Sequence, residues 1–296
     1  MFMTWILFAI FDPILHGVAN VFDNYLTNRL WKNTGSLVFY AIATNIIFIP
    51  FVFLIQRPDA PSVSAIPWIL LAGILDVVYL FPYYRALQRD DTSTVSSLFS
   101  LGYIFVPILA FLFVHEILGL HQYLGFGFVV ASSVAVTWRG RLRINRSLLY
   151  MMVAAFCVAL EAVLYKYLLA QMSWSTAFVW SNVGSFIVIV PLLFWPGTSR
   201  AIKNSWGAFK ISGHIFIIEE FFTFAGAGAM TYAISLAPVT LVEGIGALQP
   251  FFVLLYAMIF RRAFPKIFKE QTDRKSILKK FAFFGMMVIG VILILR

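Results

Sequence analysis

The first long apolar run of the chain, residues 4–26, carries a regular series of polar side chains. A run of this length is long enough to cross a bilayer as a helix. Five polar residues in or just past this run recur at spacings of four, four, three and four, and they are Asp12, His16, Asn20, Asp23 and Thr27. On a helix this spacing places all five on one face. Because a charge at the bilayer centre costs roughly 2.5–3.5 kcal/mol on insertion scales, that face is expected to point toward other helices or water.

Two interpretations of this polar stripe remain open. In the first, the side chains form a buried network that fixes how the helices pack. In the second, they line a path for a solute or for protons. The distribution of charge along the rest of the chain bears on the choice.

The composition indicates a membrane protein with many spans. Of its 296 residues, 61% are hydrophobic and only 12% are charged, and the mean hydropathy is +0.89. These values lie far from those of a soluble domain. Ten apolar windows predict ten membrane-spanning helices: 4–26, 35–55, 66–88, 94–114, 120–138, 148–170, 175–195, 213–236, 239–260 and 281–295. We therefore expect an integral, multi-pass protein of the plasma (inner) membrane.

Acids and bases are distributed differently. Almost all bases fall between the windows, where they meet lipid headgroups, so the net charge of +9 does not indicate a nucleic-acid partner. Only Lys166 and, at a window edge, Arg85 depart from this. Seven of the thirteen acids fall inside the windows, namely Asp12, Asp23, Asp76, Glu161, Glu219, Glu220 and Glu243. The sequence thus predicts an acidic interior and a basic rim.

The basic segment between residues 139 and 146 divides the windows into two sets of five. The two sets resemble each other weakly: residues 19–26 align with 161–168, and residues 84–87 align with 231–234. An odd number of spans in each repeat forces the two repeats into opposite orientations in the membrane. Transporters with this architecture hold their substrate sites between the repeats.

Over essentially its whole length the chain resembles the drug/metabolite transporter superfamily, in its ten-helix branch with two EamA-type repeats. The resemblance rests on Tyr84-Arg-Ala-Leu87, Ser96-Ser-Leu-Phe-Ser100 and Phe113-Val-His-Glu116 in the first half, and on Tyr232-Ala-Ile234 and Leu248-Gln-Pro250 in the second. The chain departs from the family in two places. The helix-4 proline position falls on Tyr103, with Pro107 one turn later, and the helix-9 acid position falls near Arg262-Ala263.

The resemblance implies an all-α membrane protein with ten transmembrane helices in two inverted five-helix repeats around a central cavity. Residues 1–138 would form the first repeat, 139–147 a basic loop, and 148–296 the second repeat. Members of the family carry small solutes, commonly as exporters, and their cavity is lined mainly by helices 1, 3, 4, 6, 8 and 9. The acids of this chain fall on those helices independently of the resemblance.

Candidate substrate- or proton-binding residues follow from these placements. Asp76 and Glu161 lie near the middle of their windows without a basic neighbour there. Tyrosines follow each acid on the same helical face. The full set is Asp12, His16, Asn20, Asp23, Asp76, Tyr79, Tyr83, Ser100, Tyr103, Glu161, Tyr165, Glu219, Glu220 and Glu243.

Some of these candidates carry narrower expectations. Side chains adjacent in sequence point about 100° apart on a helix, so only one of Glu219 and Glu220 is expected to face the cavity. A polar face on the fourth window would include Thr92, Ser96, Ser100 and Tyr103. Pro107 and Pro250 interrupt helical hydrogen bonding and are candidate hinges.

These observations favour a secondary transporter that works by alternating access. The acids suit a cationic or zwitterionic metabolite or drug-like solute, with protons as a candidate coupling ion. No enzyme motif, metal-ligand spacing or cofactor motif is found, and we expect neither a metal nor a cofactor. Two other classes remain open: a membrane sensor or partner subunit that does not transport, and an intramembrane lipid-modifying enzyme using His16 with the acids. We expect a monomer or homodimer.

The basic residues also predict an orientation. The loops after windows 1, 3, 5, 7 and 9 hold nineteen of the 22 Lys and Arg, counting Arg85 with the loop after window 3, whereas the opposite side holds only Arg57 and Arg296. The positive-inside rule then places both termini outside the cytoplasm. Ten-helix members of the family usually have both termini inside.

Overall fold

The computed structural model describes residues 4–27, 31, 33–90, 95, 98–100, 102–137, 146–260 and 274–295. These residues form helices joined by short turns and extended links, and no strand occurs among them. The longer helices are α1 (Thr4–Tyr25), α2 (Thr34–Asn45), α3 (Ile49–Ile55), α4 (Ile66–Leu87), α6 (Phe105–Val114), α7 (Leu120–Thr137), α8 (Arg146–Leu169), α9 (Trp174–Ile189), α10 (Pro196–Leu236), α11 (Val239–Gly246), α12 (Gln249–Phe260) and α13 (Arg274–Ile294).

Short-range sequence signals account for several helix ends. The side chain of Asn33 accepts a hydrogen bond from the backbone of Ser36 and caps α2, and Ser173 caps α9 in the same way. Proline stands in the first turn of α3, α4 and α10, where its missing N–H costs little. At the C-terminal end of α6, His115 adopts a left-handed conformation with φ of 53° and ends the helix.

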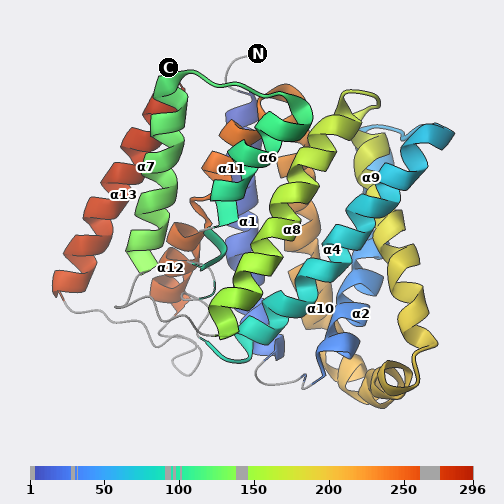
Figure 1. Ribbon diagram of the computed structural model, residues 1–296. Coiled ribbons are helices and arrows are strands. Elements are labelled where there is room, and N and C mark those ends of the chain that lie inside the picture. Colours follow the sequence, from blue (N-terminus) through green and yellow to red (C-terminus); the bar gives the residue numbers. More distant parts are fainter. Residues whose placement is uncertain are drawn as a thin grey trace.

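The helices pack as an interleaved bundle in which each half of the chain contacts the other (Figure 1). Helix α1 packs against α10, while α8 packs against α4. Helix α2 contacts α10, while α9 contacts α4. At one edge α7 and α13 lie side by side (Figure 1). The first turn of α1 and the last turn of α13 lie at the same end of the bundle, called the terminal end below (Figure 1).

Close approach of two helices from different halves depends on glycine. A Cβ at Gly125 of α7 would lie 2.6 Å from the carbonyl oxygen of Gly290 on α13, and a Cβ at Gly290 would lie 2.8 Å from that of Gly125. The same holds between α4 and α9, where a Cβ at Gly73 would come within 2.5 Å of the carbonyl carbon of Gly184. Small residues let helix backbones approach closely in this way within membranes.

Five helical segments of the described part are long and apolar enough to cross a membrane. They are Thr4–Tyr25, Thr34–Ile55, Val63–Leu87, Arg146–Leu169 and Trp174–Leu193. Shorter apolar helices include Val239–Val253 and Ala282–Ile294. The chain is thus an all-helical, multi-pass membrane protein.

The observed helices differ from the apolar windows in two places. Helix α10 begins at Pro196 rather than near residue 213 and has 41 residues. A straight helix of that length would measure about 62 Å, which exceeds the thickness of a bilayer with its headgroups. The ninth window is not one helix, because the chain turns at residues 247–248 between α11 and α12. Pro250 follows this turn directly, in the first turn of α12.

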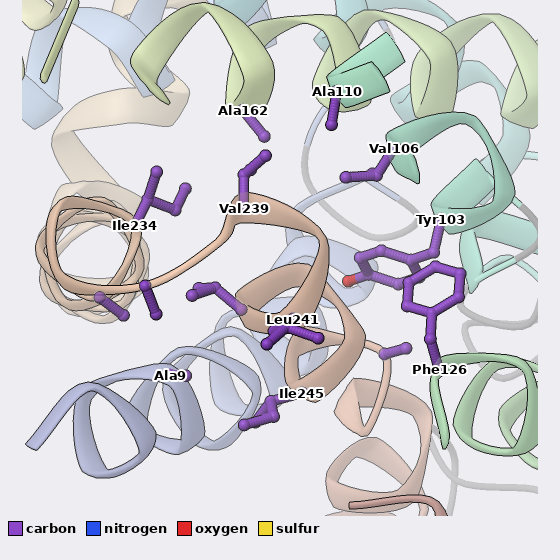
Figure 2. Packing of buried hydrophobic residues seen from close by; sticks show 14 of the residues in the cluster. Ala9, Tyr103, Val106, Ala110, Phe126, Ala162, Ile234, Val239, Leu241 and Ile245 are labelled. Atoms are coloured by element: carbon purple, nitrogen blue, oxygen red, sulfur yellow. The ribbon is translucent and has the colours of Figure 1, made fainter. Parts of the chain in front are cut away.

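One cluster of buried apolar side chains extends to the terminal end, because it includes Trp5 in the first turn of α1 and Ile294 at the end of α13. Figure 2 shows part of this cluster. It includes Ala9 of α1, Val106 and Ala110 of α6, and Val239 and Leu241 of α11. All five are at most 4% exposed. This cluster, called the terminal plug below, borders the cavity through Ala162 and Ile234.

Candidate functional site

The helices enclose a cavity of about 200 Å³ in the interior of the bundle. Both halves of the chain contribute to it. Its polar lining consists of Asp12, His16, Asn20, Asp23, Asn45, Asp76, Tyr79, Tyr83, Tyr84, Tyr103, Glu161, Tyr165, Asn182, Ser185, Glu219, Glu220, Thr223, Thr231, Glu243 and Gln249. All seven acids that the sequence places inside apolar windows therefore border one cavity.

The polar stripe of α1 lines this cavity along the helix. One ring nitrogen of His16, Nδ1, lies 2.7 Å from Oδ1 of Asp12 one turn earlier. Farther along, the hydroxyl of Tyr83 on α4 lies 2.7 Å from Oδ1 of Asn20 and 2.9 Å from Oδ2 of Asp23. One hydroxyl proton serves one acceptor at a time. The second contact therefore needs a proton from its partner, either from a rotated Asn20 amide or from a protonated Asp23 carboxyl.

Helix α10 contributes two adjacent acids, and both line the cavity. Oε1 of Glu219 accepts a hydrogen bond of 2.8 Å from the hydroxyl of Thr223. Oε2 of Glu220 accepts one of 3.1 Å from the side-chain amide of Asn45 on α2. The expectation that only one of the two acids faces the cavity is wrong, because the cavity extends around α10 far enough to reach both side chains.

Two buried carboxylate oxygens in this region have no hydrogen-bond partner. They are Oδ1 of Asp23 and Oε2 of Glu219. The residues are 6% and 2% exposed, respectively. A buried polar atom without a partner is costly and calls for an explanation, such as a bound molecule or ion.

Asp76 and Glu161 face the cavity from α4 and α8, which pack against each other. Their carboxyl groups are close enough to interact electrostatically. Both residues are half-buried, unlike the acids of α1 and α10. Tyr79 and Tyr165 line the cavity beside them, each about one turn farther along its own helix.

Near the terminal plug, Glu243 of α11 and Tyr103 approach Asp12 of α1. Gly246 of α11 lies beside both Tyr103 and Asp12. A Cβ there would lie 3.4 Å from the Tyr103 hydroxyl and 3.7 Å from Oδ2 of Asp12. It would also lie 2.7 Å from the Cε atom of Met230.

Three candidates from the sequence do not line the cavity. Ser100 is fully buried and accepts a hydrogen bond of 2.9 Å from the hydroxyl of Ser133 on α7, so it contributes to helix packing. The companions expected on its face, Thr92 and Ser96, lie outside the described residues, as do Arg262 and Ala263. Pro107 lies near the start of α6 and Pro250 near the start of α12, each beside an interruption of regular α-helix. Their role as hinges stays a prediction.

Sequence reasoning missed several polar residues of the lining. Asn45 and Asn182 each stand within an otherwise apolar window, and both line the cavity. An amide side chain inside a predicted span indicates a partner or a cavity, because an amide exposed to hydrocarbon has no hydrogen-bond partner. Gln249 and Thr223 also line the cavity. None of the four residues carries a charge, so the distribution of charge does not point to them.

The single lysine of the apolar windows lies outside the cavity lining. Nζ of Lys166 donates hydrogen bonds to the carbonyl oxygens of Ile234 and Ala237, at 2.9 and 2.8 Å. Next to it, the Glu116 carboxylate accepts hydrogen bonds from the backbone of Val239 and Thr240, at 2.8 and 2.9 Å. The pair thus caps the end of α10 and the start of α11. The hydrogen bonds that Lys166 donates within the described part of the chain therefore go to backbone carbonyl groups and not to a cavity acid.

Comparisons with known proteins agree with this architecture. Residues 3–138 match the EamA-like transporter family. A solved structure described only as "Crystal structure of protein" superposes with a TM-score of 0.57 at 13% sequence identity, covering 95% of this chain and 97% of the other. At that identity the similarity shows the fold alone. No curated protein matches the sequence.

Proposed function

We propose that the chain, whose residues 3–138 match the EamA-like transporter family, is a secondary transporter of a small cationic or zwitterionic solute. The observation that carries the proposal is the single cavity bordered by all seven acids of the apolar segments. Ionisable residues inside a membrane are costly, and they mark substrate or ion pathways. Protons are a candidate coupling ion, and export is the direction that the family suggests.

The proposal includes ten spans in two inverted repeats, residues 1–138 and 148–296, joined by the basic loop 139–147. The pattern of helix contacts supports it. Each span of the first half has a counterpart at the same position in the second half. When every span is replaced by its counterpart, the α1–α10 pair becomes the α8–α4 pair, and the α2–α10 pair becomes the α9–α4 pair. The α7–α13 pair is turned into itself, and the two glycines at its centre meet reciprocally. This is the relation expected between two copies of one five-helix unit.

Alternating access requires that the cavity open to one side of the membrane at a time. The terminal plug borders the cavity and extends to the terminal end of the bundle, and Figure 2 shows its side chains from α6 and α11. In the proposed cycle α6 and α11 separate there to admit or release the solute. Pro107 and the turn between α11 and α12 are the places where the backbone would bend.

The proposal also fixes an orientation in the plasma membrane. Most of the basic residues follow the ends of α1, α4, α7, α9 and α12 in the sequence, so these helix ends would face the cytoplasm and the terminal end would face outward.

Solute counterflow in proteoliposomes tests the function. Vesicles with purified protein are loaded with one unlabelled compound and exposed to a trace of the same compound in radiolabelled form. The panel holds amines, amino acids and cationic drugs. We expect saturable accumulation of at least one of them, and none in vesicles without protein. If no compound of the panel accumulates, the proposed function is wrong.

A further inference from the structure

The charge of the cavity lining is unbalanced along its whole length. Seven carboxyl groups line it, and the described residues of the lining include one histidine but no lysine and no arginine. Lys166, which follows the lining residue Tyr165, donates hydrogen bonds to the carbonyl groups at the end of α10. A solute with a carboxylate would therefore add an eighth acidic group to a space in which His16 is the one basic side chain among the described residues.

The acids are spread along the bundle axis rather than gathered at one point. Asp12 and Asp23 are eleven residues apart on α1, a rise of about 16 Å. Tyr83 marks the level of Asp23, because its hydroxyl contacts that carboxyl. Asp76 precedes Tyr83 by seven residues on α4, so it lies about 10 Å away along that helix. The acidic side chains thus form a row along the bundle axis rather than a compact pocket for one ammonium ion.

The lining between the acids suits a hydrocarbon chain. Aromatic side chains that line the cavity include Tyr79, Tyr84, Phe99, Tyr165, Phe178 and Phe224. Their faces pack against methylene groups and attract ammonium groups. Acids at intervals with aromatic rings between them match a solute in which amino groups alternate with short aliphatic segments.

Two oxygens of the row have no hydrogen-bond partner among the described residues. Oδ1 of Asp23 and Oε2 of Glu219 accept no hydrogen bond, although both residues are more than nine-tenths buried and line the cavity. An ammonium group carries three N–H donors and no acceptor. It would therefore satisfy both oxygens without adding an unpaired acceptor.

From these four observations we infer that the cavity binds linear aliphatic di- and polyamines, with one ammonium group near Asp23 and Glu219 and a second, about 10 Å along the bundle axis, near Asp76 and Glu161. This inference rests on the proposed function and names its substrate class. It excludes amino acids as the preferred solute, because nothing in the lining offers a full positive charge for a carboxylate apart from a protonated His16.

Three compounds with the same six-carbon chain test the inference: 1,6-diaminohexane, hexylamine and 6-aminohexanoate. Their affinities for the detergent-purified protein are measured by isothermal titration. We expect 1,6-diaminohexane to bind at least about tenfold more tightly than hexylamine, since tenfold corresponds to 1.4 kcal/mol from the second ion pair. We expect 6-aminohexanoate to bind more weakly than hexylamine. Equal or tighter binding of 6-aminohexanoate, or no binding of 1,6-diaminohexane, would overturn the inference.

The substitution Asp23→Asn then tests the position of one ammonium group. It keeps the shape of the side chain and its contact with Tyr83, but it removes a charge. The preference for 1,6-diaminohexane over hexylamine should fall to within about threefold, while hexylamine affinity changes by less. Glu219→Gln serves in the same way if the first variant does not fold. A preference unchanged in a folded variant contradicts the proposed position.

The inference and the proposed function fail in different ways. If amino acids exchange in proteoliposomes while diamines neither bind nor exchange, the transporter stands and the substrate class is wrong. If 1,6-diaminohexane binds with the expected preference but nothing exchanges, the site stands and the transport function is wrong.

Discussion

The ammonium group of Lys166 lies 2.8 Å from the carbonyl oxygen of Ala237, which is the residue that follows the last turn of α10. The same ammonium group also holds the carbonyl of Ile234. Carbonyl groups at the end of a helix lack partners within the helix, and here the chain must turn at once into α11. Lys166 on α8 therefore stabilises the turn from α10 into α11, and this turn lies beside the terminal plug.

Lys166→Met should destabilise the protein, because it leaves two carbonyl groups without their donor. We expect a loss of about 1–3 kcal/mol, seen as a lower melting temperature in detergent. The matched control is Gln171→Met, just beyond the end of α8, where the side chain is exposed and its hydrogen bond to Tyr167 is long, at 3.4 Å. Equal melting temperatures for the two variants would rule out this role for Lys166.

Much of the architecture follows from apolar length and from the positions of charges. The windows locate the helices because a span of about twenty apolar residues has few other stable arrangements. The stripe on α1 predicts its own orientation, since Asp12 and Asp23 have no tolerable position against lipid. Thirteen of the fourteen residues put forward as binding residues line one cavity.

The remaining features depend on contacts that no local pattern encodes. The partners of Lys166 are backbone atoms 68 and 71 residues away. The start of α10 is too polar for a hydropathy window, as Arg200, Lys203 and Lys210 show. Ser100 has the helical spacing expected of a cavity residue, but the hydroxyl of Ser133 on α7 donates a hydrogen bond to it. This partner could not be predicted from the local sequence around Ser100.

Gly226→Ala should disturb the pair formed by Asp12 and His16. A Cβ at position 226 would lie 2.7 Å from Nδ1 of His16, the atom that contacts Asp12. We expect lower affinity for any transported solute and a lower melting temperature. Gly213→Ala on the same helix is the control, because the nearest atoms there are 3.8 Å away. If the two variants behave alike, the contact between α10 and His16 does not matter for function.

Gly125→Ala should weaken the packing of α7 against α13. The added methyl group would meet the Gly290 carbonyl, which is backbone and cannot turn aside. Overpacking of this kind costs typically 1–3 kcal/mol. Gly127→Ala, two residues later on the same helix, meets nothing within 4 Å and should be neutral or stabilise the helix by about 0.5–1 kcal/mol. Thermal melts of the two variants give the comparison, and a stable Gly125→Ala variant would contradict the close contact.

The orientation can be measured with reporters fused after the last helix. If the basic loops face the cytoplasm, a C-terminal alkaline phosphatase should be active and a C-terminal fluorescent protein dark. The same reporters inserted after Asn145, in the loop between the halves, should give the opposite result. A fluorescent C-terminal fusion with an inactive phosphatase would place the terminal end in the cytoplasm instead.

Asp76 and Glu161 separate the two interpretations of the acidic cavity. Each faces the cavity from the middle of its helix, and their charges repel. If they bind the solute or a proton, Asp76→Asn and Glu161→Gln should reduce flux by at least about tenfold, since each loses a charged contact. The melting temperature should stay unchanged or rise, because each variant removes a buried charge. The pH dependence of flux should flatten.

A purely structural role for these two acids predicts the reverse: a lower melting temperature, with normal flux from the protein that folds. Asp59→Asn is the control, because Asp59 is an exposed acid in the link before α4 and should affect neither measurement. The two measurements must be made on the same preparations, so that a loss of flux is not confused with a loss of folded protein. Flux and pH profile both unchanged in Asp76→Asn and Glu161→Gln would remove this pair from the transport mechanism and leave the acids of α1 and α10 as the charged groups that bind the solute.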